Sequence, residues 1–193
     1  MAGMALPQSL LIEVSKLSGE ENQTLRKFSQ LHSQLVTTGV LDAAIDHVVT
    51  DRMAFAHDFL AHATADLAIG GEMSSRNALS RGYYAVHHAV RAVLLYDLKQ
   101  DFFGHFEAID SFNARLQAKP PLKAKLTSIP NIDQKLVEMI HSRHLADYYV
   151  YGTKGPKEPA LDFNAAASTA LAWISVFLAK LEEYLSDRRA NLY

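Results

Sequence analysis

The sequence contains no cysteine, so disulfide bonds, thiolate metal sites and cysteine nucleophiles are excluded. Proline is scarce, and none occurs between Pro7 and Pro120. Strand signals are nearly absent, because the chain has no sustained alternation of apolar and polar residues and no Asn-Gly or Asp-Gly turn. Neither positive nor negative charge dominates: 19 basic and 21 acidic side chains give a formal net charge of −2. A surface coated in basic residues for non-specific nucleic-acid binding is therefore not expected, whereas a local basic cleft is compatible with these numbers.

What the chain does contain is long segments rich in alanine, leucine and other helix formers, separated by clusters of glycine and proline. With 193 residues, of which 49% are apolar and 21% charged, the composition is that of a globular protein. We expect an all-α fold, in which residues 41–193 form an antiparallel up-and-down helical bundle. Residues 1–40 are expected to be an N-terminal helical extension or, alternatively, a linker-like coil. The predicted helices cover about 8–17, 20–37, 41–69, 73–100, 105–118, 131–151 and 160–188.

One uncharged stretch, from Phe163 to Ala179, needs to be weighed as a membrane span. It carries polar residues such as Asn164 and Ser168, which favours a buried helix over a span. No basic residue precedes Lys16, so the charged start of a secretory signal is missing. We therefore expect a soluble, cytoplasmic protein that does not associate with a membrane.

The segment 73–100 has two different faces when it is drawn as a helix. Its apolar residues gather on one side, and four polar or aromatic residues gather on the opposite side at spacings of 3, 4 and 3. This second face consists of Arg81, Tyr84, His88 and Arg91. It is either a solvated surface or a binding surface, because arginine offers planar donors, tyrosine stacks, and histidine titrates near neutral pH.

The segment 131–151 carries a charged pair in the middle of its apolar stripe. Arg143 and Asp147 lie four residues apart, so they can pair with each other. One interpretation is an internal ion pair that fixes the position of the helix. The other is an arginine that lines a cleft between helices or subunits, within reach of the flanking His144 and Tyr148.

Two segments resemble the HEPN superfamily (higher eukaryotes and prokaryotes nucleotide-binding). Residues 80–94, Ser-Arg-Gly-Tyr-Tyr-Ala-Val-His-His-Ala-Val-Arg-Ala-Val-Leu, are similar to its second-helix signature. Residues 143–148, Arg-His-Leu-Ala-Asp-Tyr, resemble the Arg-x-x-Ala-Asp-Tyr signature of one HEPN branch, and His105 with Ile109 and Phe112 resembles the helix between them. The resemblance covers about residues 41–188. It implies a helical bundle that forms a homodimer and acts on or around RNA, in some cases with a nucleotidyltransferase as partner protein.

The chain departs from the nuclease members of this superfamily at one position. Those members carry an arginine followed by four to six residues and then a histidine. Counted from Arg143, that histidine would fall where Tyr148, Tyr149 and Val150 stand. Cleavage of RNA needs a general acid and base that work near pH 7, and tyrosine, with an ordinary pKa of about 10, is a poor base there.

We therefore expect a non-catalytic, dimeric module that binds RNA or a nucleotide, linked to a toxin–antitoxin system or to a nucleotidyltransferase. The alternative is a metal-independent ribonuclease with a rearranged site, for which Arg143 and His144 are the candidate catalytic residues and for which His88 or His105 can also supply the histidine. No cofactor is expected. No metal is expected either, because the sequence holds a single Glu-x-x-His motif and no second one. The candidate ligand-binding residues are Arg81, Tyr84, His88, Arg143, Asp147 and Tyr148.

Overall fold

The computed structural model describes residue 36 and residues 40–148 and 162–190. Within that part of the chain, six helices have defined bounds and no strand occurs, as the all-α prediction requires. The helices are α3 (Leu41–Ile69), α4 (Glu72–Leu98), α5 (His105–Ala118), α6 (Pro120–Leu126), α7 (Ile132–Tyr148) and α8 (Phe163–Arg189). Apart from Val36 and Val40, the expected N-terminal extension lies outside the described residues.

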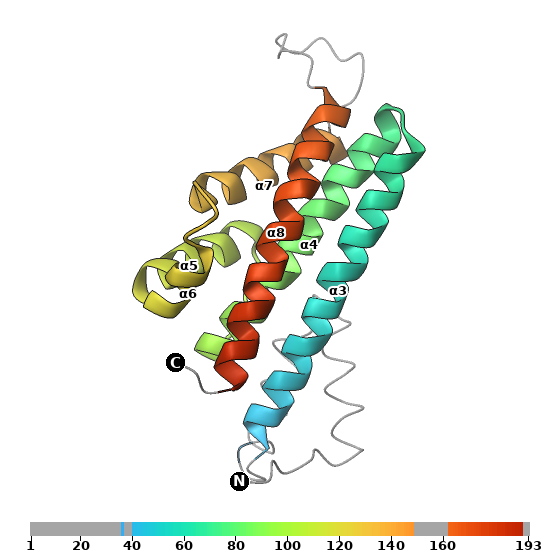
Figure 1. Ribbon diagram of the computed structural model, residues 1–193. Helices are drawn as coiled ribbons and strands as arrows, with labels where there is room; N and C mark the ends of the chain where they lie inside the picture. The colour runs from blue at the N-terminus through green and yellow to red at the C-terminus, as the bar shows by residue number, and fades with distance from the viewer. Residues whose placement is uncertain (1–35, 37–39, 149–161, 191–193) are drawn as a thin grey trace.

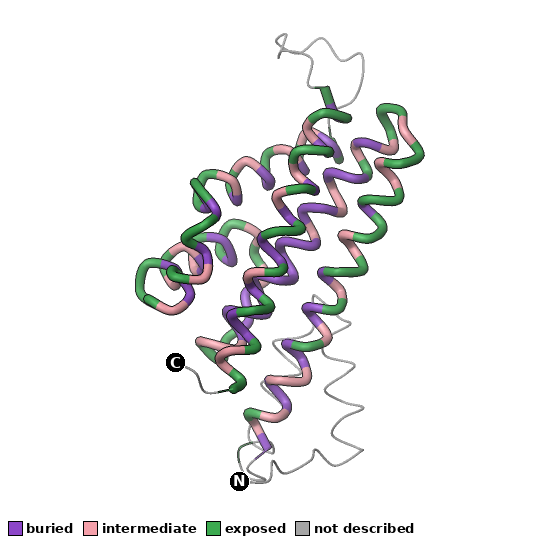
Figure 2. The backbone as a smooth tube through the Cα atoms, in the orientation of Figure 1, coloured by how far each residue is buried: buried purple, intermediate pink, exposed green. Residues whose placement is uncertain are grey.

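Helix α4 is the centre of the bundle. It packs against α3, α5, α7 and α8, and Figure 1 shows α3, α4 and α8 as three long helices that run side by side. The predicted apolar side of α4 is buried along its whole length, from Leu79 through Tyr83 and Val86 to Leu94. Figure 2 shows the same pattern, with buried positions on the inward faces of the helices and exposed positions on the outer faces. The helical period of the sequence thus identified the core side of this helix.

Glycine is needed at two places in this framework. Gly70 and Gly71 join α3 to α4 with φ angles of 78° and 82°, a region that residues with a Cβ atom avoid. Within α4, Gly82 faces α8 closely: a Cβ atom there would lie 2.9 Å from Ile174 Cδ1 and 3.0 Å from Leu171 Cδ2. The missing side chain at Gly82 therefore lets the two long helices approach each other.

One interruption of the predicted helices is different in the structure. No helix is predicted between 118 and 131, but Pro120 and Pro121 begin the short helix α6 there. Proline suits the first turn of a helix because the N–H that it lacks has no helical partner there. Leu122 and Leu126 of α6 are buried, so this short helix closes one end of the core.

Helix α8 begins at a defined cap. The Asp162 side chain accepts hydrogen bonds from the backbone N–H groups of Asn164 and Ala165, both at 3.0 Å. By length and composition alone, α8 is also the one described helix that would suffice to cross a membrane, and 33% of its most apolar window is buried. Core helices of globular proteins pass the same test, and the buried side of α8 packs on α3, α4 and α6.

Candidate functional site

The charged pair on α7 forms in the structure. Arg143 Nε lies 2.8 Å from Asp147 Oδ2, and Arg143 Nη2 donates a hydrogen bond of 3.1 Å to Tyr84 Oη on α4. The Arg143 residue is 9% exposed, so the guanidinium group is held between two helices instead of extending into solvent. The pair that spacing allowed within α7 is thus also a link between α7 and α4.

Aromatic rings surround the Arg143 guanidinium carbon. It lies 5.3 Å from the ring centroid of Tyr84 and 5.8 Å from those of Tyr83 and Tyr148, within cation–π range. Tyr84 and Arg143 are 59 residues apart along the chain, and the helices that carry them meet at this cation. We use the name Arg143 cluster for the following residues: Tyr83, Tyr84, His105, Arg143, Asp147 and Tyr148.

The environment favours the charged form of Arg143. Burial by itself lowers the pKa of an arginine, but the attraction of the oxygens of Tyr84, Asp147 and Tyr148 outweighs it, so that the pKa of Arg143 is raised above its ordinary value. The cluster therefore holds a permanently charged guanidinium group, and its orientation is fixed by hydrogen bonds and by contacts with aromatic rings. A cation of this kind is suited to holding an anionic group at its open edge.

A histidine from a third helix completes the cluster. His105 is the first residue of α5, and its Nδ1 lies 2.7 Å from Tyr83 Oη. On its other side, the His105 ring centroid lies 4.7 Å from that of His87. His87 is fully buried, and burial together with the charge of Arg91 lowers its pKa to about 2, so it stays neutral at physiological pH. His105 is half-buried and so remains within reach of solvent.

The outer edge of the cluster is aromatic. Tyr148 is 65% exposed, and its ring centroid lies 5.6 Å from that of the exposed His144. Both residues stand on the last turns of α7, next to the Arg143 guanidinium. This edge combines a flat ring, an imidazole and a nearby cation, which are groups that stack on bases and contact phosphates.

The polar face predicted on α4 is buried in its second half, so the interpretation as a solvated surface is wrong for His88 and Arg91, whereas the Arg81 side chain is 43% exposed. Arg91 is 1% exposed and His88 is 5% exposed, because this face packs against α3. The His88 ring stacks on Phe59 of α3 with centroids 5.4 Å apart, and Arg81 Nη1 pairs with Asp66 of α3 at 2.7 Å. Of this face, Tyr84 contacts Arg143, whereas Arg81 pairs with Asp66 and His88 stacks on Phe59, both on α3.

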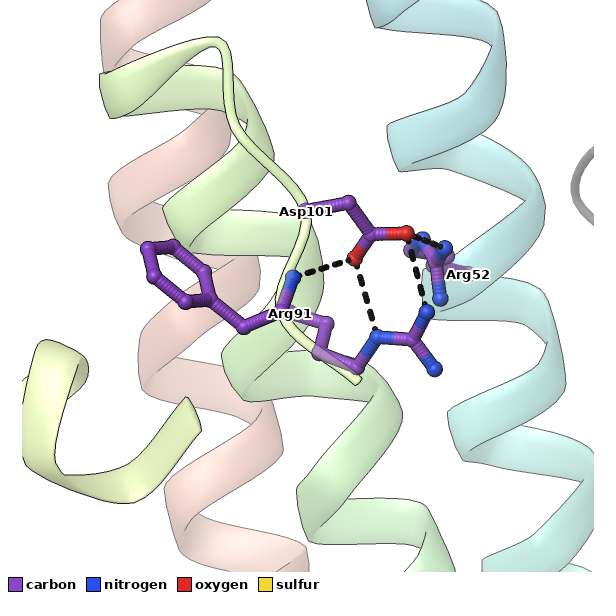
Figure 3. A network of polar contacts seen from close by, with 4 residues as sticks. Arg52, Arg91 and Asp101 are labelled. Atoms are coloured by element: carbon purple, nitrogen blue, oxygen red, sulfur yellow. Dashed lines mark hydrogen bonds and ion pairs between the residues drawn. The ribbon is translucent and has the colours of Figure 1, made fainter. Parts of the chain in front are cut away.

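Arg91 takes part in a buried network of charged groups, shown in Figure 3. Arg91 Nε and Nη2 donate to the two carboxylate oxygens of Asp101, each at 2.9 Å, in the planar fork that arginine prefers. Arg52 of α3 donates to the same carboxylate, and so does the backbone N–H of Phe102 at 3.0 Å. Arg52 is 1% exposed, so the network is buried within the bundle.

This network fixes the connection that leads into the cluster. Asp101 and Phe102 lie between the end of α4 and the start of α5, only three to four residues before His105. The Arg91 guanidinium also lies 5.2 Å from the ring centroid of Phe103. Through these contacts the connection is held on α4, and His105 is placed beside Tyr83.

Sequence reasoning found part of the cluster and missed the rest. Arg143, Asp147, Tyr84 and Tyr148 were predicted and do lie together, whereas the predicted Tyr149 and Val150 positions lie outside the described residues. The sequence indicates His105 as part of the resemblance and as a substitute histidine, but not as a neighbour of Tyr83. Tyr83 contacts His105 of α5 and Arg143 of α7, and Asp101 lies in the connection between α4 and α5. Helical periodicity indicates neither the contacts between helices nor the role of a loop residue. In the described part of the chain, no three metal-ligating side chains lie together.

In comparisons with known proteins, no family model matches the chain, and no curated protein matches it. The resemblance to the HEPN superfamily therefore rests on the sequence motifs alone.

Proposed function

We propose that this protein is a HEPN-like binding module that holds RNA or a nucleotide at the Arg143 cluster. The observation that carries the proposal is that the two segments that resemble HEPN signatures meet at one cation, since Arg143 contacts Tyr84 at 3.1 Å. The all-α bundle is the fold that the resemblance implies. Phosphate contacts position a nucleic acid and aromatic side chains stack on its bases, so the cation and the exposed Tyr148 form a suitable pair.

The proposal of binding without catalysis is supported by a missing histidine. At the three positions where the nuclease pattern would place it, the chain has Tyr148, Tyr149 and Val150. Asp147 neutralises part of the Arg143 charge, which weakens its ability to stabilise the extra negative charge of a phosphoryl transition state. In our proposal the protein acts as a cytoplasmic homodimer, and a nucleotidyltransferase is its partner protein.

The test of ligand binding is a titration of fluorescently labelled single-stranded RNA, with ATP and GTP as competing nucleotides. Arg143→Ala is expected to weaken binding by about tenfold or more, and Arg143→Lys by less, because lysine keeps the charge and loses the planar fork. Arg189→Ala is the matched control, since Arg189 pairs with Asp46 at the far end of α8. Equal affinity of Arg143→Ala, Arg189→Ala and the parent protein would refute the proposal.

The test of assembly is light scattering at micromolar concentration. A dimer has twice the chain mass of 21.4 kDa, and a mass of 21.4 kDa would contradict this part of the proposal. Co-purification with a nucleotidyltransferase encoded beside the gene tests the partner, and its failure leaves the RNA-binding proposal intact.

A second candidate function is metal-independent RNA cleavage, and it is favoured by the position of His105. The imidazole is bonded to Tyr83, whose ring contacts the Arg143 guanidinium, so a titratable group and a cation share one site. Cleavage in the presence of EDTA that ends in a cyclic phosphate is the expected sign. His105→Ala and His144→Ala then separate the two histidines. RNA cleavage that persists in both variants would show that the Arg143 cluster is not the source of the activity.

A further inference from the structure

A groove on the opposite side of α7 from Tyr148 has no role in the proposed function. Helices α7 and α8 both pack on α4, and they leave between them a groove of about 510 Å³. Cavities of this volume bury a ligand of drug-like size. The residues around the groove include Leu79, Lys135, Glu138, Met139, Ala165 and Trp173.

The wall of the groove is apolar and contains one large ring. Leu79 and Met139 are buried core residues, and the alanines of α8 leave space in front of Trp173. The indole stacks on Phe177 with ring centroids 4.7 Å apart and an interplanar angle of 15°, so it presents a flat surface. A flat apolar wall beside small side chains fits a planar molecule.

The charged groups at the rim are already engaged. Lys135 Nζ lies 2.7 Å from Glu138 Oε2, and Asp162 accepts the capping hydrogen bonds of α8. A charged ligand would have to compete with these partners. A neutral ligand meets no such competition, so the rim favours a neutral molecule.

One polar atom at the groove is unsatisfied. The indole nitrogen of Trp173 is buried, and no residue that the structure describes accepts its hydrogen bond. A buried N–H without a partner destabilises the folded protein. A ligand that carries an acceptor can offset this cost after a small rotation of the ring.

We propose that this groove binds a neutral, planar, largely apolar small molecule that presents one hydrogen-bond acceptor to the Trp173 indole. The inference does not depend on the RNA-binding proposal, because the groove and the Arg143 cluster are lined by different residues. Trp173 is the only tryptophan of the chain, so its fluorescence reports on the groove directly.

The probe is prodan, a neutral naphthyl ketone, titrated into the full chain while Trp173 emission and energy transfer to the probe are recorded. We expect saturable binding at one site per chain, and weaker binding of a naphthalenesulfonate, whose charge finds no free partner. Ala165→Phe fills the groove and is expected to lower prodan affinity by about tenfold or more. Ala172→Phe is the matched control, because Ala172 is also an exposed alanine of α8 and lies outside the groove.

Three results would overturn the proposal. The first is quenching that rises without saturation. The second is equal prodan affinity in Ala165→Phe and Ala172→Phe when circular dichroism shows both to be folded. The third is a loss of dimer mass in Ala165→Phe alone, which would make the groove an interface between two copies of the chain. Trp173→Phe, followed by the emission of prodan itself, is expected to bind a few-fold more weakly because the indole donor is gone.

Discussion

Replacing Asp101 by asparagine removes the negative charge that two buried guanidinium groups share. The Asp101 carboxylate accepts two hydrogen bonds from Arg91, one from Arg52 and one from the backbone N–H of Phe102. Asparagine keeps a single acceptor oxygen and turns an NH₂ group toward a cation. Hydrogen bonds to charged groups contribute about 1.5–3 kcal/mol each, and breaking a buried ion pair from one side costs about 3–5 kcal/mol. We expect Asp101→Asn to lower the free energy of unfolding by about 3–5 kcal/mol.

A loss of this size is a large fraction of a total stability of about 5–15 kcal/mol. In a domain of this size it corresponds to a fall in Tm of about 6–20 °C. Urea unfolding followed by far-UV circular dichroism measures the loss in the free energy of unfolding, and a thermal scan measures the fall in Tm. Asp42→Asn is the control, because the Asp42 side chain is 88% exposed where it pairs with Lys99, and such pairs contribute less than about 1 kcal/mol.

A double-mutant cycle separates charge from packing. If the cost of Asp101→Asn is the charge left on Arg91 and Arg52, then Arg91→Gln combined with Asp101→Asn is less destabilising than the sum of the single variants, by about 0.5–3 kcal/mol. Strict additivity, or a stability of Asp101→Asn within about 0.5 kcal/mol of the parent protein, would refute this reasoning.

Three further predictions concern other polar groups of the bundle. Tyr184 Oη lies 2.7 Å and 2.9 Å from the carboxylate oxygens of the fully buried Asp97 side chain, so Tyr184→Phe is expected to lower the free energy of unfolding in urea by about 1.5–3 kcal/mol, and an unchanged midpoint would contradict this. Burial and nearby arginines lower the pKa of His87 to about 2 and that of His88 to about 3, whereas the unfolded value is 6.5. The unfolded chain therefore binds more protons below pH 6.5, and stability present above that pH is lost as the pH falls toward 3, by at most about 1.4 kcal/mol per pH unit for each histidine. Acid unfolding of His87→Gln and His88→Gln variants tests this, and a pH profile as steep as that of the parent would exclude it. Asp147→Asn is expected to lower Tm by a few degrees, because the pair with Arg143 is only partly buried, and calorimetry that shows a loss as large as that of Asp101→Asn would make the pair a core element.

The helices could be predicted from the sequence because their boundaries are encoded locally. The pair Gly70-Gly71 and the segment around Pro120 interrupt long runs of helix formers, and interruptions of this kind are visible without any knowledge of the fold. Helix α6 was missed because the same prolines that end one helix suit the first turn of the next.

The polar face of α4 could not be interpreted correctly from its own sequence. Arg91 looks like a surface residue in a helical projection of α4. Its burial is possible because the carboxylate of Asp101 offsets the cost of removing the guanidinium charge from water. Asp101 lies in a loop where no periodicity applies, and Arg52 reaches it from 49 residues away. The same limit explains why Arg143 and Asp147, which lie four residues apart on one helix, were identified, whereas the contact between Tyr83 and His105 was not.

The connection from α4 to α5 joins the stability of the bundle to the geometry of the candidate site. Arg91 holds this connection at Asp101, and Tyr83, two turns earlier on α4, holds it again at His105. Because both anchors stand on one rigid helix, the position of His105 depends on the buried network, whereas Arg143 depends on Tyr84 and Asp147. A partly destabilised but folded Asp101 variant should therefore disturb functions that need His105 before those that need Arg143. Cleavage by the second candidate mechanism would then be lost while RNA affinity is kept, and loss of both together would mean that the two residues are not positioned independently.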